Sequence, residues 1–498
     1  MAEDKKEGQK KQLSIVKEAL EDNEKIERDR KEESLKNSVK DSAAVNATAG
    51  FGDNYLSAYA VAMNATNSQV AMLTSVPNLI APLSQLFTPK LMEKVSRKKI
   101  FSISILIQSL LWIPMILVSL FFIGGIKYAP LFIVIFFTLY AITGNFAAPA
   151  MASWLGDLID KKNAGKFFGF RNKIGGITAL SSMLIGGLTL SFFEKKVALI
   201  TGKTWTVFIG FSLIFFLAMI FRLISRYYVL KQYEPEFKIQ QGYYFNFLDF
   251  IKKSYKNNYG KFVLFVALMV FATNIAGPLT TVYVLRKLNF SYLQYTFFLV
   301  AAAVFTFMFM PVWGRFSDKY GNVKMIKITS FMVPLIILFW GIPYFTWGEA
   351  AHPALTFYFY ILIQFFSGFA WAGFNLAAGN FVYDAVTPAR RSLCVAYSSI
   401  LNGIGVFIGA TLGGLMATAL PIKFMDKIMF VLLLSGIIRL IIAFIFNNKI
   451  KEVKSVEKYK PLLKIHFPIQ PYIGIMQLIF PIRGIKKIFS KKQKGIKK

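Results

Sequence analysis

Asp53 is the residue of this 498-residue chain whose type and position most strongly suggest chemistry. It lies about halfway along an apolar stretch, residues 42–64, that is long enough to cross a bilayer. An ionised carboxylate at that depth is costly, so it must be paired, protonated or in contact with water. Alternation between these states would couple a proton to the movement of a solute, whereas a permanent ion pair would make the residue structural.

A second charged feature is the segment 313–322, which reads WGRFSDKYGN and lies between two long apolar stretches. Arg315, Asp318 and Lys319 cannot stand unpaired in hydrocarbon, so this segment must lie at a water-facing edge. Gly314 and Gly321 are expected to let the backbone turn sharply there. The sequence therefore predicts a short charged turn between two membrane spans.

The composition identifies the class of protein that holds these charges. Hydrophobic residues make up 55% of the chain, and the mean hydropathy is +0.49. They come in runs of about 20 residues, which is typical of a polytopic helical membrane protein. The net charge of +32 would suggest nucleic acid in a soluble protein. Here the Lys and Arg residues fall mainly in short loops and tails, so the positive-inside rule explains them and no nucleic-acid partner is expected.

Other kinds of chemistry have little support in the residues. The chain has one cysteine and two histidines, which argues against a disulfide framework and against a metal site. No complete phosphate-binding loop supports ATP hydrolysis, and no nucleophile–base constellation stands out. We therefore expect a protein that is not an enzyme and that has no cofactor and no bound metal.

Twelve stretches are long and apolar enough to be spans. The first is the least hydrophobic, and its small residues favour packing against neighbouring helices or a cavity. The predicted spans are 42–64, 69–88, 100–123, 130–156, 166–193, 204–228, 262–284, 293–313, 325–345, 353–382, 393–420 and 428–447.

Three polar segments complete the organisation. Residues 1–41 are expected to be a charged, partly helical cytoplasmic extension and not a signal peptide, because no short apolar region follows a basic start. Residues 229–260 are expected to form a cytoplasmic linker that lies on the membrane surface, with Tyr243, Phe245 and Phe250 among its lysines. Residues 448–498 form a basic amphipathic tail, which anionic lipid headgroups would attract.

The two halves of the chain, 42–228 and 261–447, repeat at an offset of about 225 residues. Each matching pair is weak, but their common order favours duplication of a six-helix unit. The pairs are Leu56 with Leu279, Ser68 with Ser291, Glu93 with Asp318, Asn145 with Asn375, Asp157 with Asp384, and Arg222 with Arg439.

The pattern G-R-x-x-D-x-x-G at 314–321 resembles the signature loop of the major facilitator superfamily. In that family the loop joins the second and third helices of each half on the cytoplasmic side. The resemblance covers residues 42–447, although the first-half turn has Pro89, Glu93 and Ser96 where the family has glycines and aspartate. It implies an all-α membrane protein with twelve transmembrane helices in two six-helix halves, and it is specific to a superfamily, not to a substrate.

In this superfamily the first, fourth, seventh and tenth helices line a central cavity. The resemblance therefore implies substrate contacts or proton sites at polar and aromatic residues of these helices, while an interhelical hydrogen bond worth about 1 kcal/mol or less is the alternative. These candidates are Asp53, Asn54, Asn145, Asn274, Gln364, Trp371 and Asn375.

The signature turns also suggest a gate on the cytoplasmic side. Asp318 is expected near the amino end of the fifth helix, at about 166–169, where backbone N–H groups favour an anion. By the repeat, Glu93 would meet the start of the eleventh helix near Arg391. The alternative is a topology anchor without a gating role. The remaining gating candidates are Arg97, Asp157, Arg171, Gly314, Arg315, Gly321, Asp384 and Arg390.

These features predict a secondary active transporter that moves a small solute by alternating access, with proton coupling. The alternatives are an uncoupled facilitator, an exporter of hydrophobic compounds, or a lipid scramblase or non-transporting sensor on the same scaffold. The loop charges place both termini in the cytoplasm of a multi-pass plasma-membrane protein. Its partners would be a small-molecule solute and membrane lipids, with anionic headgroups at the tail, and it would act as a monomer.

Overall fold

The computed structural model describes residues 2–160, 164–202, 204–235, 247–454 and 456. The described residues contain helices and connections but no strand. They form two compact units. The first unit comprises 1–241, 277–296 and 406–420, and the second comprises 242–276, 297–405 and 421–498.

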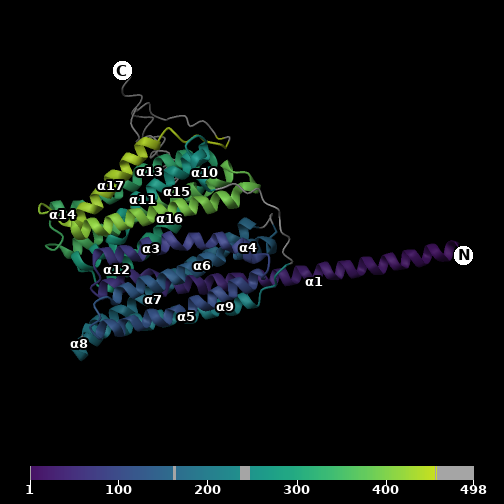
Figure 1. The fold of residues 1–498 in the computed structure, drawn as a ribbon, viewed down its shortest axis with the longest axis horizontal. Coiled ribbons are helices and arrows are strands. Elements are labelled where there is room, and N and C mark those ends of the chain that lie inside the picture. Colours follow the sequence, from purple (N-terminus) through teal and green to yellow (C-terminus); the bar gives the residue numbers. More distant parts are fainter. Residues whose placement is uncertain (1, 161–163, 203, 236–246, 455, 457–498) are drawn as a thin grey trace, which may run out of the picture. The chain divides into compact units, whose positions relative to one another are not determined.

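The described chain consists of helical elements, and Figure 1 labels most of the α-helices among them. The first half of the chain contains α1 (Ala2–Phe51), η1 (Asp53–Tyr55), α2 (Leu56–Ala62), α3 (Asn67–Ser84), η2 (Gln85–Phe87), α4 (Thr88–Met92), α5 (Arg97–Ile123), α6 (Ala129–Leu158), α7 (Ala164–Ser191), η3 (Phe192–Val197), α8 (Ala198–Thr201), η4 (Thr204–Thr206) and α9 (Val207–Leu230). The second half contains α10 (Phe247–Ser254), α11 (Asn258–Val282), η5 (Tyr283–Lys287), α12 (Tyr292–Tyr320), α13 (Asn322–Phe339), α14 (Gly341–Thr346), α15 (Pro353–Ala385), α16 (Pro388–Ala419) and α17 (Lys427–Phe446).

Eleven helical segments of the described chain are long and apolar enough to cross a membrane. They confirm the expected spans from the second onward. The first expected span differs, because the end of α1, the short turn η1 and α2 together occupy its place. A hydrophobic-length criterion misses this segment since α1 begins in the charged extension and continues into the bundle without a break.

Helix α1 has a protruding part and a packed part, and Figure 1 shows its amino end extending beyond the other helices of the first unit. In the protruding part, Lys31 donates to Glu27 at 2.8 Å and lowers the pKa of that carboxyl. Burial begins at Ser34, which is 1% exposed, and Asp41 is 2% exposed. Packing therefore starts before residue 42, the boundary that hydropathy predicts.

The break after α1 has a steric cause. A Cβ atom added to Gly52 would lie 2.2 Å from the ring of Trp112 on α5, so only glycine fits where the helix ends. Two residues earlier, a Cβ atom added to Gly50 would lie 2.7 Å from the Ala179 carbonyl oxygen of α7. These close approaches fix the position of Asp53, which follows directly.

The first unit also contains the outer ends of three helices from the second half, at 277–296 and 406–420. The Tyr55 and Thr296 hydroxyls lie 2.9 Å apart. Ser68 donates to the Gly414 carbonyl at 3.1 Å, and Arg286 donates to the Val61 carbonyl at 3.2 Å. By the alternation of the spans, these contacts lie at the membrane side opposite the signature turns.

In the second unit α13 packs against α15 and α17, and the core includes Trp313 of α12, whose indole donates to the Phe369 carbonyl at 2.7 Å. The expectation of a turn at Gly314 is wrong, because Gly314 lies inside α12. Gly321 alone makes the turn between α12 and α13, with φ +88°. The charged signature is therefore the last part of a helix and not a loop.

The predicted surface segment between the halves is described only in part. Helix α10 places Phe250 in a buried position against Tyr259 and Tyr397, while Leu248 is exposed. Tyr243 and Phe245, and nearly all of the predicted basic tail, lie outside the described residues.

Candidate functional site

Asp53 lies in η1, where the first membrane segment changes from one helix to the next. Its carboxylate oxygen Oδ1 is buried and accepts no hydrogen bond. The Tyr140 hydroxyl lies within hydrogen-bonding reach of the carboxylate, and Arg222 is the cation that acts on it. Half of this carboxylate is thus left without a partner inside the first unit.

Arg222 of α9 is the centre of a buried polar network. It is 6% exposed, and its Nε donates to Oε1 of Gln108 at 3.0 Å. Its Nη2 donates to the same oxygen, and its Nη1 donates to the Ser225 hydroxyl at 3.3 Å. Ser225 in turn donates to Asp41 Oδ1 at 2.7 Å. These contacts hold one guanidinium between the two carboxylates of α1 and η1.

Asp41 extends the network to α7. Its Oδ2 lies 3.5 Å from Nη2 of Arg171, which also donates from Nε to the Ser38 hydroxyl at 3.2 Å. Two carboxylates, Asp41 and Asp53, therefore face two arginines, and they lie about 18 Å apart along the helix axis. A proton that enters or leaves would change the charge of a buried, otherwise balanced cluster.

Our sequence analysis missed Asp41 and Gln108, and it used Arg222 only as a marker of the repeat. Asp41 lies just before the boundary where hydropathy begins to rise, so it was assigned to the solvated extension. The arginine itself was the available signal, because a cation inside an apolar span requires a nearby partner.

Asn145 of α6 is partly buried and bonds within the first unit. Its Oδ1 accepts from Gln85 at 2.8 Å, and its Nδ2 donates to the Ala141 carbonyl at 3.0 Å. Gly156 lies about three helical turns later on the same face of α6, and a Cβ atom added there would meet nothing within 4 Å. This face of α6 is polar and unfilled.

In the second unit Asn375 of α15 is exposed, and a Cβ atom added to Gly379, one turn later, would meet nothing within 4 Å. Phe366, also exposed, lies on the opposite face of the helix. Trp371 is half-buried, one turn before Asn375. Helix α15 thus has an exposed polar face and an exposed apolar face.

The other predicted contacts lie in different settings. Gln364 is 7% exposed and donates to the Phe298 carbonyl of α12 at 3.2 Å. This is a hydrogen bond between two packed helices, the alternative that the sequence left open for these candidates. Asn274 is half-buried and donates to the Val270 carbonyl of its own helix at 2.8 Å. Asn54 is exposed and donates to the Ala49 carbonyl at 2.9 Å.

At the inner end of the first unit, Arg97 gathers two carboxylates. It is fully buried and pairs with Asp157 at the end of α6. Its backbone N–H donates to Glu234 Oε1 at 2.7 Å, and its Nη2 donates to the Pro235 carbonyl at 2.9 Å. These bonds hold Glu234 and Pro235, which follow α9, against the start of α5, where the first-half signature turn ends. Glu234 is a contact that sequence reasoning did not find.

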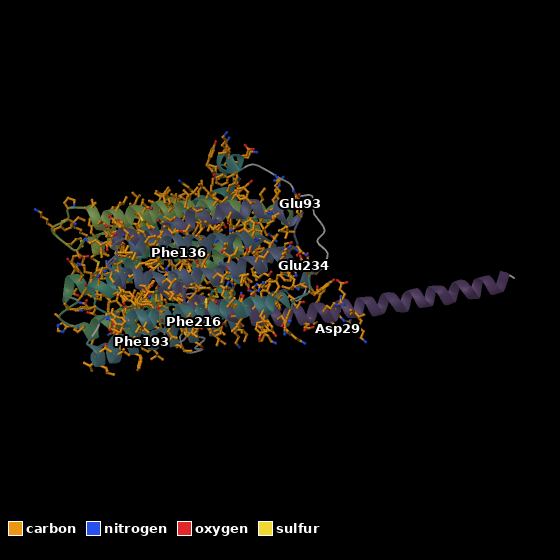
Figure 2. The ribbon with its side chains drawn as sticks, turned by 60° about the horizontal axis from the view of Figure 1, so that its bottom comes forward. Asp29, Glu93, Phe136, Phe193, Phe216 and Glu234 are labelled. Carbon is orange, nitrogen blue, oxygen red and sulfur yellow. The ribbon has the colours of Figure 1, made fainter. Side chains whose placement is uncertain are left out.

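Glu93 lies beside this cluster but is exposed. It lines a surface hollow of about 270 Å³ together with Lys94, Arg97 and Glu234. Figure 2 shows Glu93 and Glu234 at the end of the first unit where α1 leaves it, with Phe193 at the opposite end. The hollow therefore lies at the end of this half where α1 leaves it.

At the second-half turn the Asn322 amide makes the contacts to a carboxylate, whereas at the first-half turn the Arg97 guanidinium makes them. Asn322 donates to Asp384 Oδ2 at 2.7 Å and accepts from Ser317 at 2.6 Å. Glu452 accepts from the Val323 N–H at 2.7 Å, beside the turn. Asp318 is 82% exposed, and its carboxylate lies 3.9 Å from the Lys454 ammonium.

The two cations predicted for the second-half gate, Arg315 and Arg390, are both exposed. Among the residues that the structure describes, no three His, Cys, Asp or Glu side chains gather as metal ligands.

The comparisons with known proteins agree with this architecture. The family model of the Major Facilitator Superfamily matches residues 43–360 and 262–492, which together cover most of the chain. The chain belongs to the major facilitator superfamily. Its resemblance at the signature segment is confirmed, as is the all-α fold of this family of multi-pass membrane proteins. No curated protein matches the sequence.

Solved structures of the major facilitator superfamily share the fold at low identity. A mutant of the nucleoside transporter NupG is 16% identical, with a TM-score of 0.64 over 84% of this chain and 100% of that chain. The inward-open xylose transporter XylE from E. coli is 15% identical, with a TM-score of 0.62 over 84% and 96%. A bacterial homologue of the human lysosomal transporter Spinster is 15% identical, with a TM-score of 0.60 over 84% and 97%. These likenesses establish the fold.

Proposed function

We propose that this chain is a proton-coupled secondary active transporter that moves a small solute by alternating access, and that it is not an enzyme. The observation that supports the coupling is the setting of Asp53, with one buried carboxylate oxygen that has no partner. A buried group of this kind is stable only when it is protonated, paired or hydrated.

The proposed proton site follows from how Asp53 and Arg222 are connected. When Asp53 is ionised, it competes with Asp41 for the charge of Arg222. When Asp53 takes up a proton, the charge of Arg222 is balanced by Asp41 alone, and its hydrogen bonds to Gln108 and Ser225 remain. Because Asp53 lies at a helix break, the two protonation states would favour different arrangements of η1.

The proposed path for the solute uses the open polar faces of α6 and α15. Asn145 and Asn375 lie on these faces, each in its own unit. The hydrogen bonds of Tyr55, Ser68 and Arg286 would have to break for the outer side to open. Glu93 and Asp318, with the ion pairs around them, remain the proposed gate at the inner side.

The distribution of Lys and Arg supports a location in the plasma membrane with both termini in the cytoplasm. Lysines and arginines concentrate in the connections that follow α4, α6 and α9 and in the α12–α13 turn. We propose a monomer whose partners are a small solute and membrane lipids. Anionic headgroups would meet the basic tail.

The test is transport by purified protein in vesicles that contain a pH-sensitive dye. D-xylose and a nucleoside open the solute panel, because two similar structures are named for them. We expect a solute that moves together with protons in the wild type. Asp53→Asn should abolish proton movement but keep exchange of labelled solute between equal concentrations on the two sides. Asn375→Ala, the control, should weaken solute movement and leave the proton-to-solute ratio unchanged.

The other outcomes separate the alternatives. Solute movement without a dye response in the wild type would identify an uncoupled facilitator. Transfer of fluorescent lipid between leaflets without any solute movement would identify a scramblase. Proton coupling that survives in Asp53→Asn would refute the proposed proton site.

A further inference from the structure

Arg439 lies inside an apolar span, and none of the described residues of its unit forms an ion pair with it. It is located on α17, about 10 Å from the helix end at Phe446, and is 5% exposed. Its Nη2 donates to the Thr273 carbonyl at 3.2 Å, whereas its Nε is buried without a partner. The Thr273 hydroxyl is also buried and unpartnered. A guanidinium donor and a hydroxyl are therefore both left unsatisfied between α11 and α17.

No carboxylate of the described second unit is placed to neutralise this charge. Its acidic residues all lie at helix ends or in connections, and several of them contact other groups there. Glu349 accepts from Tyr360 at 2.8 Å, and Asp426 accepts from two backbone N–H groups at the start of α17. The described acidic residues are Asp249, Asp318, Glu349, Asp384, Asp426 and Glu452.

The repeat shows what Arg439 lacks. It corresponds to Arg222, whose guanidinium has Gln108, Ser225 and the two carboxylates as partners. The repeat pairs Asp41 and Asp53 with Leu264 and Ala276, and it pairs Ser225 with Ile442. The segment 333–338, VPLIIL, stands where Gln108 would fall. The second half has kept the arginine and replaced its partners by apolar residues.

Burial of an unpaired guanidinium is unfavourable, because arginine does not lose its proton and its donors need acceptors. An unsatisfied donor and hydroxyl at one place match the two or three oxygens of a carboxylate or phosphate group. We propose that Arg439, together with Thr273, binds the anionic group of the transported solute. This inference rests on the proposed transport function and assigns that solute to the carboxylates or phosphate esters.

Such a site would also fit alternating access. The anion would be bound only in states in which the solute can reach α11 and α17, so its binding energy would differ between states and shift their populations. In the first half the equivalent arginine, Arg222, has carboxylates of the chain itself beside it. The solute would therefore supply in the second half the charge that Asp41 and Asp53 supply in the first.

The experiment compares three solutes on one skeleton: glucose, gluconate and glucose 6-phosphate. Their binding is measured as shifts in the melting temperature of the full chain in phosphatidylcholine nanodiscs. Inorganic phosphate and a dicarboxylate, succinate, extend the anionic arm. We expect at least one anionic solute to stabilise the wild type, and glucose to have no effect. Arg439→Gln should weaken the apparent affinity by at least about 30-fold, since it removes a buried charge-assisted pair.

Two more variants and one control complete the design. Arg439→Lys should bind more weakly than the wild type but more tightly than Arg439→Gln, because it keeps the charge and loses the planar fork. Thr273→Val should weaken binding by about tenfold through loss of one hydrogen bond to a charged group. Lys427→Gln, on the same helix, should leave binding unchanged. If Arg439→Gln does not fold, Thr273→Val and Arg439→Lys still decide the matter.

Three results of the binding experiment, and one of the transport experiment, would overturn the assignment. One is equal binding by the wild type and Arg439→Gln, and another is stabilisation by neutral solutes only. The third is stabilisation by phosphatidylglycerol in the nanodisc without any response to a soluble anion, which would make a lipid headgroup the ligand. A neutral solute that moves with protons in vesicles would refute this inference and leave the transport function intact.

Discussion

The two halves of the molecule carry the same buried arginine in opposite surroundings. Arg222 is enclosed by a glutamine, a serine and two carboxylates, whereas Arg439 donates one bond to a backbone carbonyl and has an unsatisfied Nε. The inner ends differ in a related way, because Arg97 holds two carboxylates in one half and Asn322 bridges Ser317 and Asp384 in the other. The two halves thus share the arginine position and differ in the groups that surround it.

This difference teaches that a repeated fold can divide its chemistry between its copies. The first half holds a closed, balanced network that can respond to a proton. The second half holds a buried arginine with an unsatisfied donor, and we propose that an anion binds there. A transporter that couples the two needs both kinds of site, and the duplication supplies two equivalent places in which to build them.

The largest expected effect is a difference between the stability changes caused by two equivalent substitutions, one in each half. Arg222→Met should destabilise the protein by roughly 3–5 kcal/mol, because it leaves Asp41 and Asp53 buried without their common cation. Arg439→Met should be neutral or stabilising in the absence of solute, because it removes an unpaired buried charge. Melting of both variants in detergent measures the contrast. Equal destabilisation would show that Arg439 has a partner within the folded chain.

A smaller effect is expected at the inner ends. Arg97→Met should destabilise by roughly 3 kcal/mol, since it breaks contacts to Asp157 and Glu234 at a fully buried guanidinium. Asn322→Ala, its counterpart, should lose about 1.5–2 kcal/mol, because it removes a hydrogen bond to the Asp384 carboxylate. Chemical unfolding followed by tryptophan fluorescence would rank them. The reverse ranking would mean that the second-half turn, and not the first, holds its unit together.

The third effect concerns backbone positions in the two halves. Gly52→Ala should destabilise by about 1–3 kcal/mol, because its Cβ atom would meet the Trp112 ring at 2.2 Å. Gly379→Ala, where the added atom meets nothing within 4 Å, should keep full stability or gain a few tenths of a kcal/mol in helix propensity. Differential scanning calorimetry of the two variants would distinguish them. An equal loss of stability in both variants would contradict the free space beside Gly379 on α15.

The sequence predicted the architecture well, because the determinants are local. Eleven long apolar stretches become helices of the expected extent, and the signature segment identifies the family. The first segment was harder, since α1 joins a charged extension to a packed helix without any change in conformation. Hydropathy reports where a helix becomes apolar, whereas packing at Ser34 and Asp41 depends on neighbours far along the chain.

The candidate site was less predictable for the same reason. The residue types pointed to Asp53, but they could not supply Asp41, Gln108 or the rotation of α9 that brings Arg222 to both carboxylates. Gln364 illustrates the converse: its type suggested a substrate contact, and its amide is buried against a backbone carbonyl. The role of each candidate in transport stays a prediction.

The smallest effect on stability is expected at the signature carboxylates. Asp318 is 82% exposed, and its contact with Lys454 at 3.9 Å is an exposed pair, so Asp318→Asn should change stability by less than about 0.5 kcal/mol. Glu93→Gln should be equally mild, because Glu93 is exposed. Both variants should nevertheless slow solute exchange several-fold if these carboxylates act in the gate, because they would then bias a two-state equilibrium rather than hold a fold.

Solute exchange in vesicles, measured beside the melting temperature of the same preparations, separates these roles. Slower exchange at unchanged stability in both variants would extend the comparison of the halves to the gate itself. Unchanged exchange in Asp318→Asn would reduce the second-half signature to a topology anchor. A defect in Glu93→Gln alone would then place the gate on the first half, beside Arg97 and Glu234, where the buried charges already gather.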